Sequence, residues 1–367
     1  MIYLNNAATS YPKPPAVARA VCAALEAPPQ GHDRATGGPE SRPDCRIALA
    51  RLLGCAAERL VLTANATHAL NLALLGFGWE PGDVVLTTAA EHNSVLRPLY
   101  HLQKWGRLRY EMLPVGPDGR VPLKQWESAL ARLKPRMAVF THASNVSGAV
   151  QDVGALCALA KGVGATVLVD ASQTVGLLPV TPAAWGADLV AFTGHKYLLG
   201  PQGTGGLYVG PQMELHPVLT GGTGVRSDED EMPPQLPGRL EAGTGNGPSF
   251  AGLAAALDYA QAQPLNFPRL LSRTARLEDG LRRVGMTVLP VAGLRTPVIS
   301  AVSPIYDSET VGEILSASYD IVCRTGLHCA PHYPNLPGGT VRFSLSRFTT
   351  DAQVEQTIAA LEEIHRG

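Results

Sequence analysis

The sequence has no excess of charge of either sign and no long hydrophobic run. It carries 30 basic and 31 acidic residues, so its composition provides no strong electrostatic attraction to nucleic acid or to an anionic membrane. No uninterrupted apolar stretch approaches the roughly 20 residues that cross a bilayer, and the N-terminus has no basic segment followed by an apolar core. We therefore expect a cytoplasmic protein that acts on small molecules.

Cysteine is scarce as well, with six residues scattered along the chain and no paired spacing typical of a metal site. We expect thiols in a reducing compartment and no bound metal. No internal repeat is visible. A length of 367 residues and a hydrophobic content of 45% suit one large and one small domain with ample core.

Apolar strands alternate with helical segments through the first two thirds of the chain. Strands are expected at 59–63, 84–87, 109–113, 137–141, 166–169, 187–192 and 207–209, and helices at 16–26, 45–53, 69–75, 94–103, 123–133 and 153–161. This alternation predicts an α/β fold with a mainly parallel sheet covered by helices on both faces.

The last hundred or so residues have the pattern of a separate, smaller α/β domain. Helices are expected at 250–262, 268–284, 310–318 and 350–365, and strands at 298–302, 321–323 and 341–345. We place the large domain at residues 15–250 and the small domain at residues 1–14 and 251–367. Residues 27–44 and 210–249 are rich in Gly and Pro and are expected to be loops.

Two neighbouring apolar runs end on residues with complementary chemistry. Lys196 closes the turn after the run 187–192, and its amine could capture an aldehyde. Asp170 ends the run 166–169, and an acid there could keep a pyridine nitrogen protonated. Most lysines are only solvated surface charges, but an acid and a lysine at the ends of adjacent strands are what a pyridoxal phosphate site requires.

Other polar residues also follow predicted strands, namely His92, Asn145 and Gln173. Ligands of parallel α/β sheets lie beyond the carboxyl ends of the strands, so this shared position predicts one site. Small and hydroxyl residues at 64–68 precede a helix, where free amides suit an anion. An ordinary helix cap by Asn65 or Thr67 explains the same residues equally well.

The order of these motifs along nearly the whole chain resembles one family. It is the class V, fold-type I aminotransferase family of pyridoxal phosphate-dependent proteins, and within it the cysteine desulfurase and selenocysteine lyase branch. No single motif is specific, but their common order is. The motifs are Tyr3-Leu4-Asn5-Asn6-Ala7-Ala8-Thr9, Ala66-Thr67, Glu91-His92-Asn93, His142-Ala143-Ser144-Asn145-Val146-Ser147-Gly148, Asp170-Ala171-Ser172-Gln173, Thr193-Gly194-His195-Lys196, Glu241-Ala242-Gly243-Thr244, Arg324-Thr325-Gly326-Leu327-His328-Cys329-Ala330 and Val341-Arg342-Phe343-Ser344-Leu345.

The resemblance implies a role for each matching residue. Lys196 would bind pyridoxal phosphate covalently and carry the substrate Cα proton, and Lys196, Cys329 and His92 would be the catalytic residues. The implied cofactor contacts are Asp170 to the ring nitrogen, Gln173 to the phenolic oxygen and His92 stacked on the ring. Thr67, Thr193 and His195 would bind the phosphate, with Thr244 from the second subunit of a homodimer, and Ala66 would also contact the cofactor. Asn145 and Arg342 would hold the substrate carboxylate, a task that suits the planar guanidinium.

Cys329 is the residue that indicates the desulfurase branch within this family. It lies in the run 324–339, which is rich in Pro and Gly and is expected to be an exposed loop, whereas Cys157 lies in an apolar periodic segment. Arg324, His328 and His332 would favour the reactive thiolate. The resemblance then implies a desulfurase that converts L-cysteine to L-alanine, holds the sulfur as a persulfide on Cys329 and passes it to an acceptor protein or small thiol.

Alternatives stay open at this point. A selenocysteine lyase would depend less on a protein thiol, and another lyase, aminotransferase or epimerase of this scaffold would not need Cys329. The chain could also be a non-catalytic scaffold that binds the cofactor or a sulfur-transfer partner. It departs from the family at Asn5 and His68, where acids are common, and in loops 31–44 and 222–237, which we expect to influence substrate and partner choice.

Overall fold

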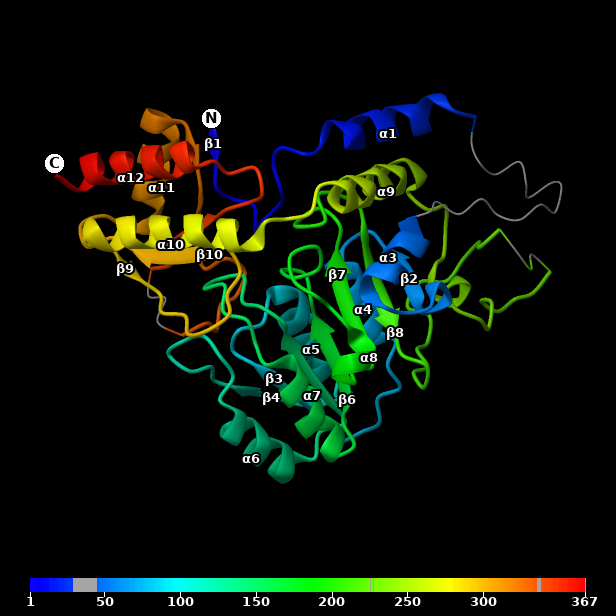
Figure 1. The fold of residues 1–367 in the computed structure, drawn as a ribbon. Coiled ribbons are helices and arrows are strands. Elements are labelled where there is room, and N and C mark those ends of the chain that lie inside the picture. Colours follow the sequence, from blue (N-terminus) through cyan, green and yellow to red (C-terminus); the bar gives the residue numbers. More distant parts are fainter. Residues whose placement is uncertain (29–44, 225, 227, 335–337, 367) are drawn as a thin grey trace.

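A seven-stranded sheet forms the centre of the larger part of the molecule in the computed structural model, which describes residues 1–28, 45–224, 226, 228–334 and 338–366 (Figure 1). All neighbours from β7 to β4 pair in parallel, and β8 runs antiparallel to both β7 and β2. The predicted mainly parallel sheet is therefore confirmed. Its strands in spatial order are β2 (Leu60–Thr63), β8 (Gly205–Val209), β7 (Leu189–Thr193), β6 (Thr166–Asp170), β5 (Met137–Thr141), β3 (Val84–Thr88) and β4 (Arg109–Leu113).

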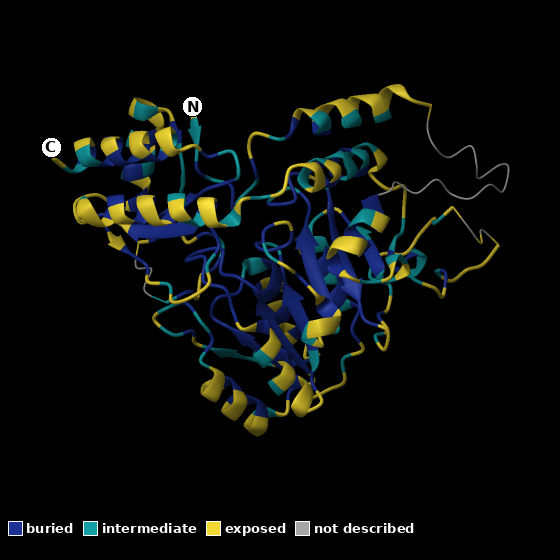
Figure 2. Cartoon of the chain, viewed as in Figure 1, coloured by how far each residue is buried: buried dark blue, intermediate teal, exposed yellow. Residues whose placement is uncertain are grey.

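Helices cover both faces of this sheet, so its strands are buried and mostly apolar except the edge strand β4, which is partly exposed and contains Arg109 and Glu111 (Figure 2). Successive residues of β5 alternate between two cores: Ala138 and Phe140 pack on one face and Val139 on the other. The first face is covered by α3 (Cys45–Leu53), α6 (Leu123–Leu133) and α7 (Val153–Gly162), and the second by α4 (Ala66–Leu75) and α5 (Asn93–Lys104). A short helix, α8 (Pro182–Trp185), follows β6.

The C-terminal part forms a smaller unit around a four-stranded antiparallel sheet. Its strands are β12 (Arg324–Gly326), β13 (Thr340–Ser344), β10 (Val298–Val302) and β9 (Thr287–Val288), and its helices are α10 (Phe267–Arg283), α11 (Ser308–Tyr319) and α12 (Asp351–Arg366). The N-terminal strand β1 (Ile2–Tyr3) pairs with β11 (Ile321–Val322) in this unit. A second, smaller α/β unit is thus confirmed.

Two further helices lie over the large sheet. Helix α1 (Pro15–Glu26) runs along α9 (Gly247–Ala262), and Phe250 and Leu253 of α9 belong to the core of that sheet (Figure 1). The division of the chain at residues 14 and 250 stays a prediction.

Two sequence-based boundaries near the site were wrong. Helix α4 begins at Ala66, not Ala69, because the side chain of Asn65 accepts a hydrogen bond from the His68 amide and caps the helix earlier. Residues 324–326, expected to be part of a loop, form strand β12 because they pair with β13. These changes place Thr67 in a first helical turn and Arg324 on a rigid strand.

The loop predictions have mixed outcomes. Residues 228–231, an acidic run, are exposed as expected of a solvated loop. The predicted loop 31–44 lies outside the described residues. Across the described part of the chain, no helix has the length and apolar character needed to span a membrane.

Candidate active site

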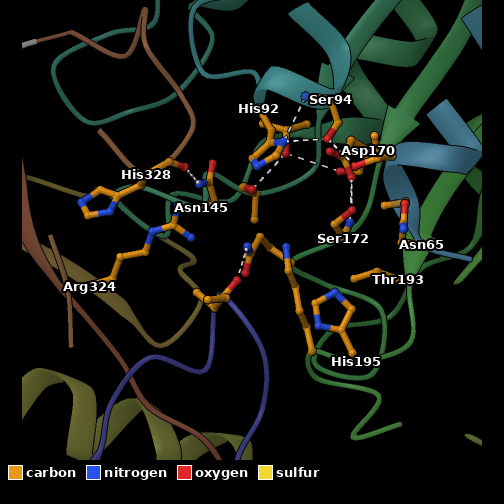
Figure 3. A pocket seen from close by; sticks show the side chains of 18 of the residues that line it. Asn65, His92, Ser94, Asn145, Asp170, Ser172, Thr193, His195, Arg324 and His328 are labelled. Carbon is orange, nitrogen blue, oxygen red and sulfur yellow. Dashed lines mark hydrogen bonds between the residues drawn. The ribbon is translucent and has the colours of Figure 1, made fainter. Parts of the chain in front are cut away.

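A pocket of about 180 Å³ opens at the carboxyl ends of the parallel strands. Its walls come from the segments after β2, β3, β5, β6 and β7 and from the small sheet (Figure 3). In the figure, Arg324, His328 and Asn145 lie on one side, and Asp170 and Thr193 lie on the other. The structure thus brings together ten of the predicted residues: Ala66, Thr67, His92, Asn145, Asp170, Gln173, Thr193, His195, Lys196 and Arg342.

Lys196 lies in the turn after β7 and presents its amine to the pocket. Removal of the amine from water lowers the pKa of Lys196 to about 8, and the positive charges of Arg342 and Arg324 act in the same direction. The negative charge of Asp170 opposes this shift. The neutral, nucleophilic form of the amine is therefore more populated near neutral pH than in an ordinary surface lysine.

Asp170 is the last residue of β6 and is buried. Its Oδ1 atom accepts hydrogen bonds from the amide of Ser172, at 2.9 Å, and from the Ser172 hydroxyl. These two bonds fix the direction of the carboxylate. Asp170 and Lys196 thus face one pocket from the ends of adjacent parallel strands.

A chain of hydrogen bonds joins His92 to the start of α4. His92 caps α5, because its Nδ1 atom accepts from the Ser94 amide at 3.0 Å. The Ser94 hydroxyl lies 2.9 Å from His92 Nδ1 and 2.7 Å from the Thr67 hydroxyl. Burial, followed by the nearby charge of Lys196, lowers the pKa of His92 to about 4, so the ring is neutral at pH 7. A capping role and a position at the pocket are therefore combined in one residue.

The other end of the pocket suits an anion. Helix α4 starts there, and the first amides of a helix have no intrahelical acceptor. Thr193 and His195 complete this wall, and the buried Nδ1 of His195 has no hydrogen-bond partner within the described residues. Burial lowers the pKa of His195 to about 4, with smaller effects from Lys196 and Lys13.

Gln173 is buried and lines the pocket. Its Nε2 atom donates to the carbonyl of Ala7 at 3.1 Å. Its Oε1 atom is buried and lacks a partner among the residues that the structure describes. A buried amide oxygen without a donor in a pocket indicates a missing ligand group.

Two arginines face each other at the opposite wall. Arg342 of β13 and Arg324 of β12 are directly paired across the strands, where like charges are destabilising. Arg342 is 1% exposed and donates to the Asn145 carbonyl, at 2.8 Å, and to Asn5 Oδ1, at 3.1 Å. Both acceptors are neutral, and burial lowers the pKa of Arg342 to about 10. An anion between these side chains would compensate both charges.

The loop that carries Cys329 is fixed beside this wall, although Cys329 itself is not among the lining residues. The Asn145 side chain donates to the His328 carbonyl at 2.6 Å, and the Asn93 amide donates to the Cys329 carbonyl at 2.8 Å. Arg324 Nη2 donates to Cys329 Sγ at 3.1 Å. His328 and Cys329 both have left-handed backbone, with φ of 54° and 60°, a strained conformation that these contacts maintain.

His328 does not supply the positive charge that the sequence suggested for Cys329. Burial lowers the pKa of His328 to about 3, so its ring is neutral, and its Nε2 atom lies 2.7 Å from the Thr340 hydroxyl. His332 is exposed. Thr244 is exposed too and does not line the pocket of its own chain, so its expected role across a dimer stays a prediction.

Several pocket residues were not predicted as site residues, among them Ser94 and Ser172, and Asn65 was predicted only as a possible helix cap. Ser172 lies between Asp170 and Gln173, and a hydroxyl two residues after a strand-end acid was a usable signal. Ser94 follows the predicted His92 at a helix start, and this position also favours side-chain hydrogen bonds to the backbone. Arg324 was named only as a neighbour of Cys329, and its place opposite Arg342 required the strand pairing.

The fold and pocket define a class of α/β proteins with a lysine in the pocket, a strand-end acid and an anion site at one edge of a mainly parallel sheet. Residues 2–357 match the family model described as aminotransferase class-V. The chain belongs to the class V aminotransferase family, whose members generally depend on pyridoxal phosphate.

Individual relatives agree with this assignment. A probable cysteine desulfurase of Methanothermobacter thermautotrophicus is 32% identical over 338 residues, covering 88% of this chain and 83% of the relative. A cysteine desulfurase of Escherichia coli is 32% identical over 329 residues, covering 84% of this chain and 79% of the relative. The apo structure of a cysteine desulfurase from Thermococcus onnurineus superposes with a TM-score of 0.90 at 28% identity and covers 100% of this chain and 95% of that one.

The pocket residues fit pyridoxal phosphate. The cofactor carries a phosphate, and the start of α4 offers free amides beside Thr67 and His195. It carries a ring nitrogen and a phenolic oxygen, and the pocket offers a buried carboxylate at Asp170 and the side-chain amide of Gln173, whose Nε2 atom has a second hydrogen besides the one donated to Ala7. It binds through a lysine amine, and Lys196 provides one with a lowered pKa.

Proposed function

We propose that the chain is a pyridoxal phosphate-dependent cysteine desulfurase that converts L-cysteine to L-alanine and holds the sulfur as a persulfide on Cys329. The contact between Arg324 Nη2 and Cys329 Sγ carries this proposal. Arg324 lines the pocket of Lys196, so the contact keeps a thiol beside the place where an amino acid would bind. Other reactions of the family do not need a thiol there.

The match between the pocket residues and the groups of pyridoxal phosphate assigns each residue a contact with the cofactor. Lys196 would hold the cofactor covalently, and Asp170 would pair with its ring nitrogen. Gln173 would face the phenolic oxygen and His92 the ring. When bound, pyridoxal phosphate supplies an electron-accepting ring next to the amino acid Cα. Ala66, Thr67, Thr193 and His195 would surround the phosphate, with Thr244 of a second copy of this chain.

Arg342 would bind the substrate carboxylate, with Asn145 beside it. The guanidinium is buried and has only neutral acceptors, so a carboxylate gives it the opposite charge that the described residues do not provide. The substrate Cα is thereby held toward Lys196. The neutral fraction of the Lys196 amine removes the Cα proton and returns it to the product.

The thiol step balances without an added oxidant. The Cys329 thiolate attacks the sulfur of cysteine, and an S–S bond forms as the C–S bond breaks. The electron pair of that bond remains on the substrate carbon, which takes a proton and becomes the methyl group of alanine. One thiol and one cysteine thus give one persulfide and one alanine, and the sulfur passes to an acceptor protein or small thiol.

Replacement of Cys329 tests the proposal directly. We expect Cys329→Ala to lose nearly all alanine release from L-cysteine in the presence of a reductant, measured as alanine per cofactor. Cys22→Ala, which removes an exposed thiol from α1, is the matched control and should keep wild-type turnover. Unchanged turnover by Cys329→Ala would show that Cys329 is not the sulfur acceptor.

The activities of wild-type protein and Cys329→Ala on L-cysteine and L-selenocysteine distinguish the two candidate substrates. We expect wild-type protein to act on L-cysteine, whereas a selenocysteine lyase would act on L-selenocysteine and keep that activity in Cys329→Ala. Exchange of an amino group with a keto acid, without alanine release, would instead favour an aminotransferase. A homodimer, which would bring Thr244 to the partner's phosphate site, and a cytoplasmic location are further parts of the proposal.

A further inference from the structure

Four donors from one N-terminal segment converge on a single backbone carbonyl, that of His195. The Ser10 amide and the Lys13 ammonium are closest, at 2.9 and 2.8 Å, and the hydroxyls of Thr9 and Ser10 lie at 3.1 and 3.2 Å. A carbonyl oxygen has two lone pairs, and the two shortest contacts, from the Ser10 amide and the Lys13 ammonium, occupy them. The peptide bond of this carbonyl leads directly to Lys196.

The rest of the lysine turn is closed by local backbone hydrogen bonds. The Gly194 amide donates to the Thr204 carbonyl at 2.8 Å, and the amides of Leu199 and Gly200 donate to the carbonyls of Lys196 and Gly194, both at 2.9 Å. These three bonds leave the peptide plane between His195 and Lys196 to be fixed by other groups. The groups that fix it lie more than 180 residues away in the sequence.

Lys13 is the charged member of this set. Its ammonium donates to the Ser10 hydroxyl at 2.7 Å as well as to the His195 carbonyl, so both acceptors are neutral oxygens. Lys13 is partly buried, and this burial lowers its pKa to about 8. Holding a charge there is unfavourable, but a charged donor binds a carbonyl more strongly than a neutral one.

The same segment also holds the strand of the substrate-carboxylate arginine. Asn6 Nδ2 donates to the Ser344 carbonyl, and the Ala7 amide donates to the Ser344 hydroxyl, both at 2.9 Å. Arg342 itself donates to Asn5 Oδ1. Residues 5–13 therefore connect strand β13 to the turn of Lys196, two parts of the pocket that come from different sheets.

We propose that Lys13 is a positioning residue for Lys196: its ammonium fixes the His195 carbonyl and thereby orients the Lys196 amine relative to Arg342. Lys13 is not among the residues that line the pocket, so it acts through the backbone and not on the substrate. The inference rests on the proposed function only in the role that it gives Lys196.

Three variants of the full-length protein separate this role from general stability. Lys13→Met removes the charge and the donor, Lys13→Arg keeps both, and Lys124→Met removes an exposed lysine from α6 as a control. We expect the amides of residues 196–200 to exchange with deuterium about tenfold faster in Lys13→Met, as for loss of one charged hydrogen bond. Exchange in strand β5 should be unchanged, and Lys13→Arg and Lys124→Met should behave as wild type.

Kinetics of the cofactor-loaded enzyme give a second readout. A displaced Lys196 amine slows proton transfer but leaves the carboxylate site intact, so Lys13→Met should lower kcat about tenfold and leave KM within about twofold. Lys13→Arg should restore kcat. A purely structural role would instead lower Tm and speed exchange throughout the chain, with wild-type kcat in the folded protein.

Three results would overturn the proposal: wild-type exchange at residues 196–200 in Lys13→Met, faster exchange spread evenly over the chain, or no restoration by Lys13→Arg. If Lys13→Met does not fold, Lys13→Gln, which keeps a neutral donor, is compared with Lys13→Arg, and equal exchange in the two overturns it. Hydrogen exchange needs no substrate, so it tests Lys13 even if the protein shows no desulfurase activity.

Discussion

Arg342 and Arg324 are the residues whose surroundings most clearly demand a ligand. They lie directly opposite each other on antiparallel strands, and both line the pocket. After burial, the positive charge of Arg324 is the next cause that lowers the pKa of Arg342. The hydrogen-bond acceptors of Arg342 are neutral, so they do not compensate its charge. A bound carboxylate would remove this repulsion, whereas Arg324 is already directed to the sulfur of Cys329. The two arginines thus have separate tasks.

At this scale we predict that Arg342→Lys weakens binding of the amino acid. A lysine keeps the charge but loses the planar pair of donors, so kcat/KM for L-cysteine should fall about 100-fold, mostly through KM. Arg276→Lys, an exposed position on α10, is the control. Cysteamine, which lacks the carboxylate, should be used equally poorly by wild type and Arg342→Lys. A normal KM for L-cysteine in Arg342→Lys would exclude the assigned role.

The start of α4 is the element that shapes the anion end of the pocket. Strand β8 passes close beneath it, because a Cβ atom at Gly205 would lie 2.8 Å from the backbone of Asn65 and 2.8 Å from the Phe192 carbonyl. Asn65 is the cap of α4, so any shift of its backbone moves the free amides of Ala66 and Thr67. A glycine in the strand thereby determines the position of a helix end.

For this element we predict that Gly205→Ala destabilises the protein and weakens cofactor binding. Overpacking at a buried position costs about 1–3 kcal/mol, and the displaced cap should raise the Kd for pyridoxal phosphate. Gly162→Ala at the end of α7, where a Cβ atom meets nothing within 4 Å, should change the free energy of unfolding by less than about 1 kcal/mol. Urea unfolding and cofactor titration measure both effects; equal behaviour of the two variants would contradict the argument.

At the scale of the whole molecule, the pKa values of four buried or partly buried histidines among the described residues are far below the ordinary value. Burial is the main cause in each case, and it lowers the pKa of His92, His142 and His195 to about 4 and that of His328 to about 3. The unfolded chain therefore binds protons first as the pH falls. Glu91 acts in the opposite direction, since burial raises its pKa to about 8.

We predict that the free energy of unfolding of the cofactor-free protein falls between pH 6.5 and pH 4. Groups with a lowered folded pKa contribute stability above the unfolded pKa and lose it below, by up to about 1.4 kcal/mol per group and pH unit. Four histidines outweigh the single opposing carboxyl. Urea unfolding at a series of pH values measures the slope, and His328→Gln should reduce it by about one proton. A free energy independent of pH over this range would refute the prediction.

Most of the large sheet could be predicted from the sequence, because strands buried on both faces are almost purely apolar and stand out from the helices. Strand β12 could not, since Arg324, Thr325 and Gly326 have no apolar pattern and become a strand only by pairing with β13. The start of α4 could be predicted only as one of two alternatives: Asn65 and Thr67 are both suitable caps, and only the hydrogen bond from the His68 amide to Asn65 shows which of them caps the helix.

The sequence by itself determined that Asp170, Lys196 and His92 meet in one pocket, because parallel strands bring their carboxyl ends to one edge and each of these residues follows such a strand. Only the tertiary structure placed Arg324 opposite Arg342, tied Cys329 to Arg324 and brought Lys13 to the carbonyl of His195. Those contacts depend on strand register, loop geometry and the packing of segments up to 182 residues apart. Local patterns of polarity carry no information about them.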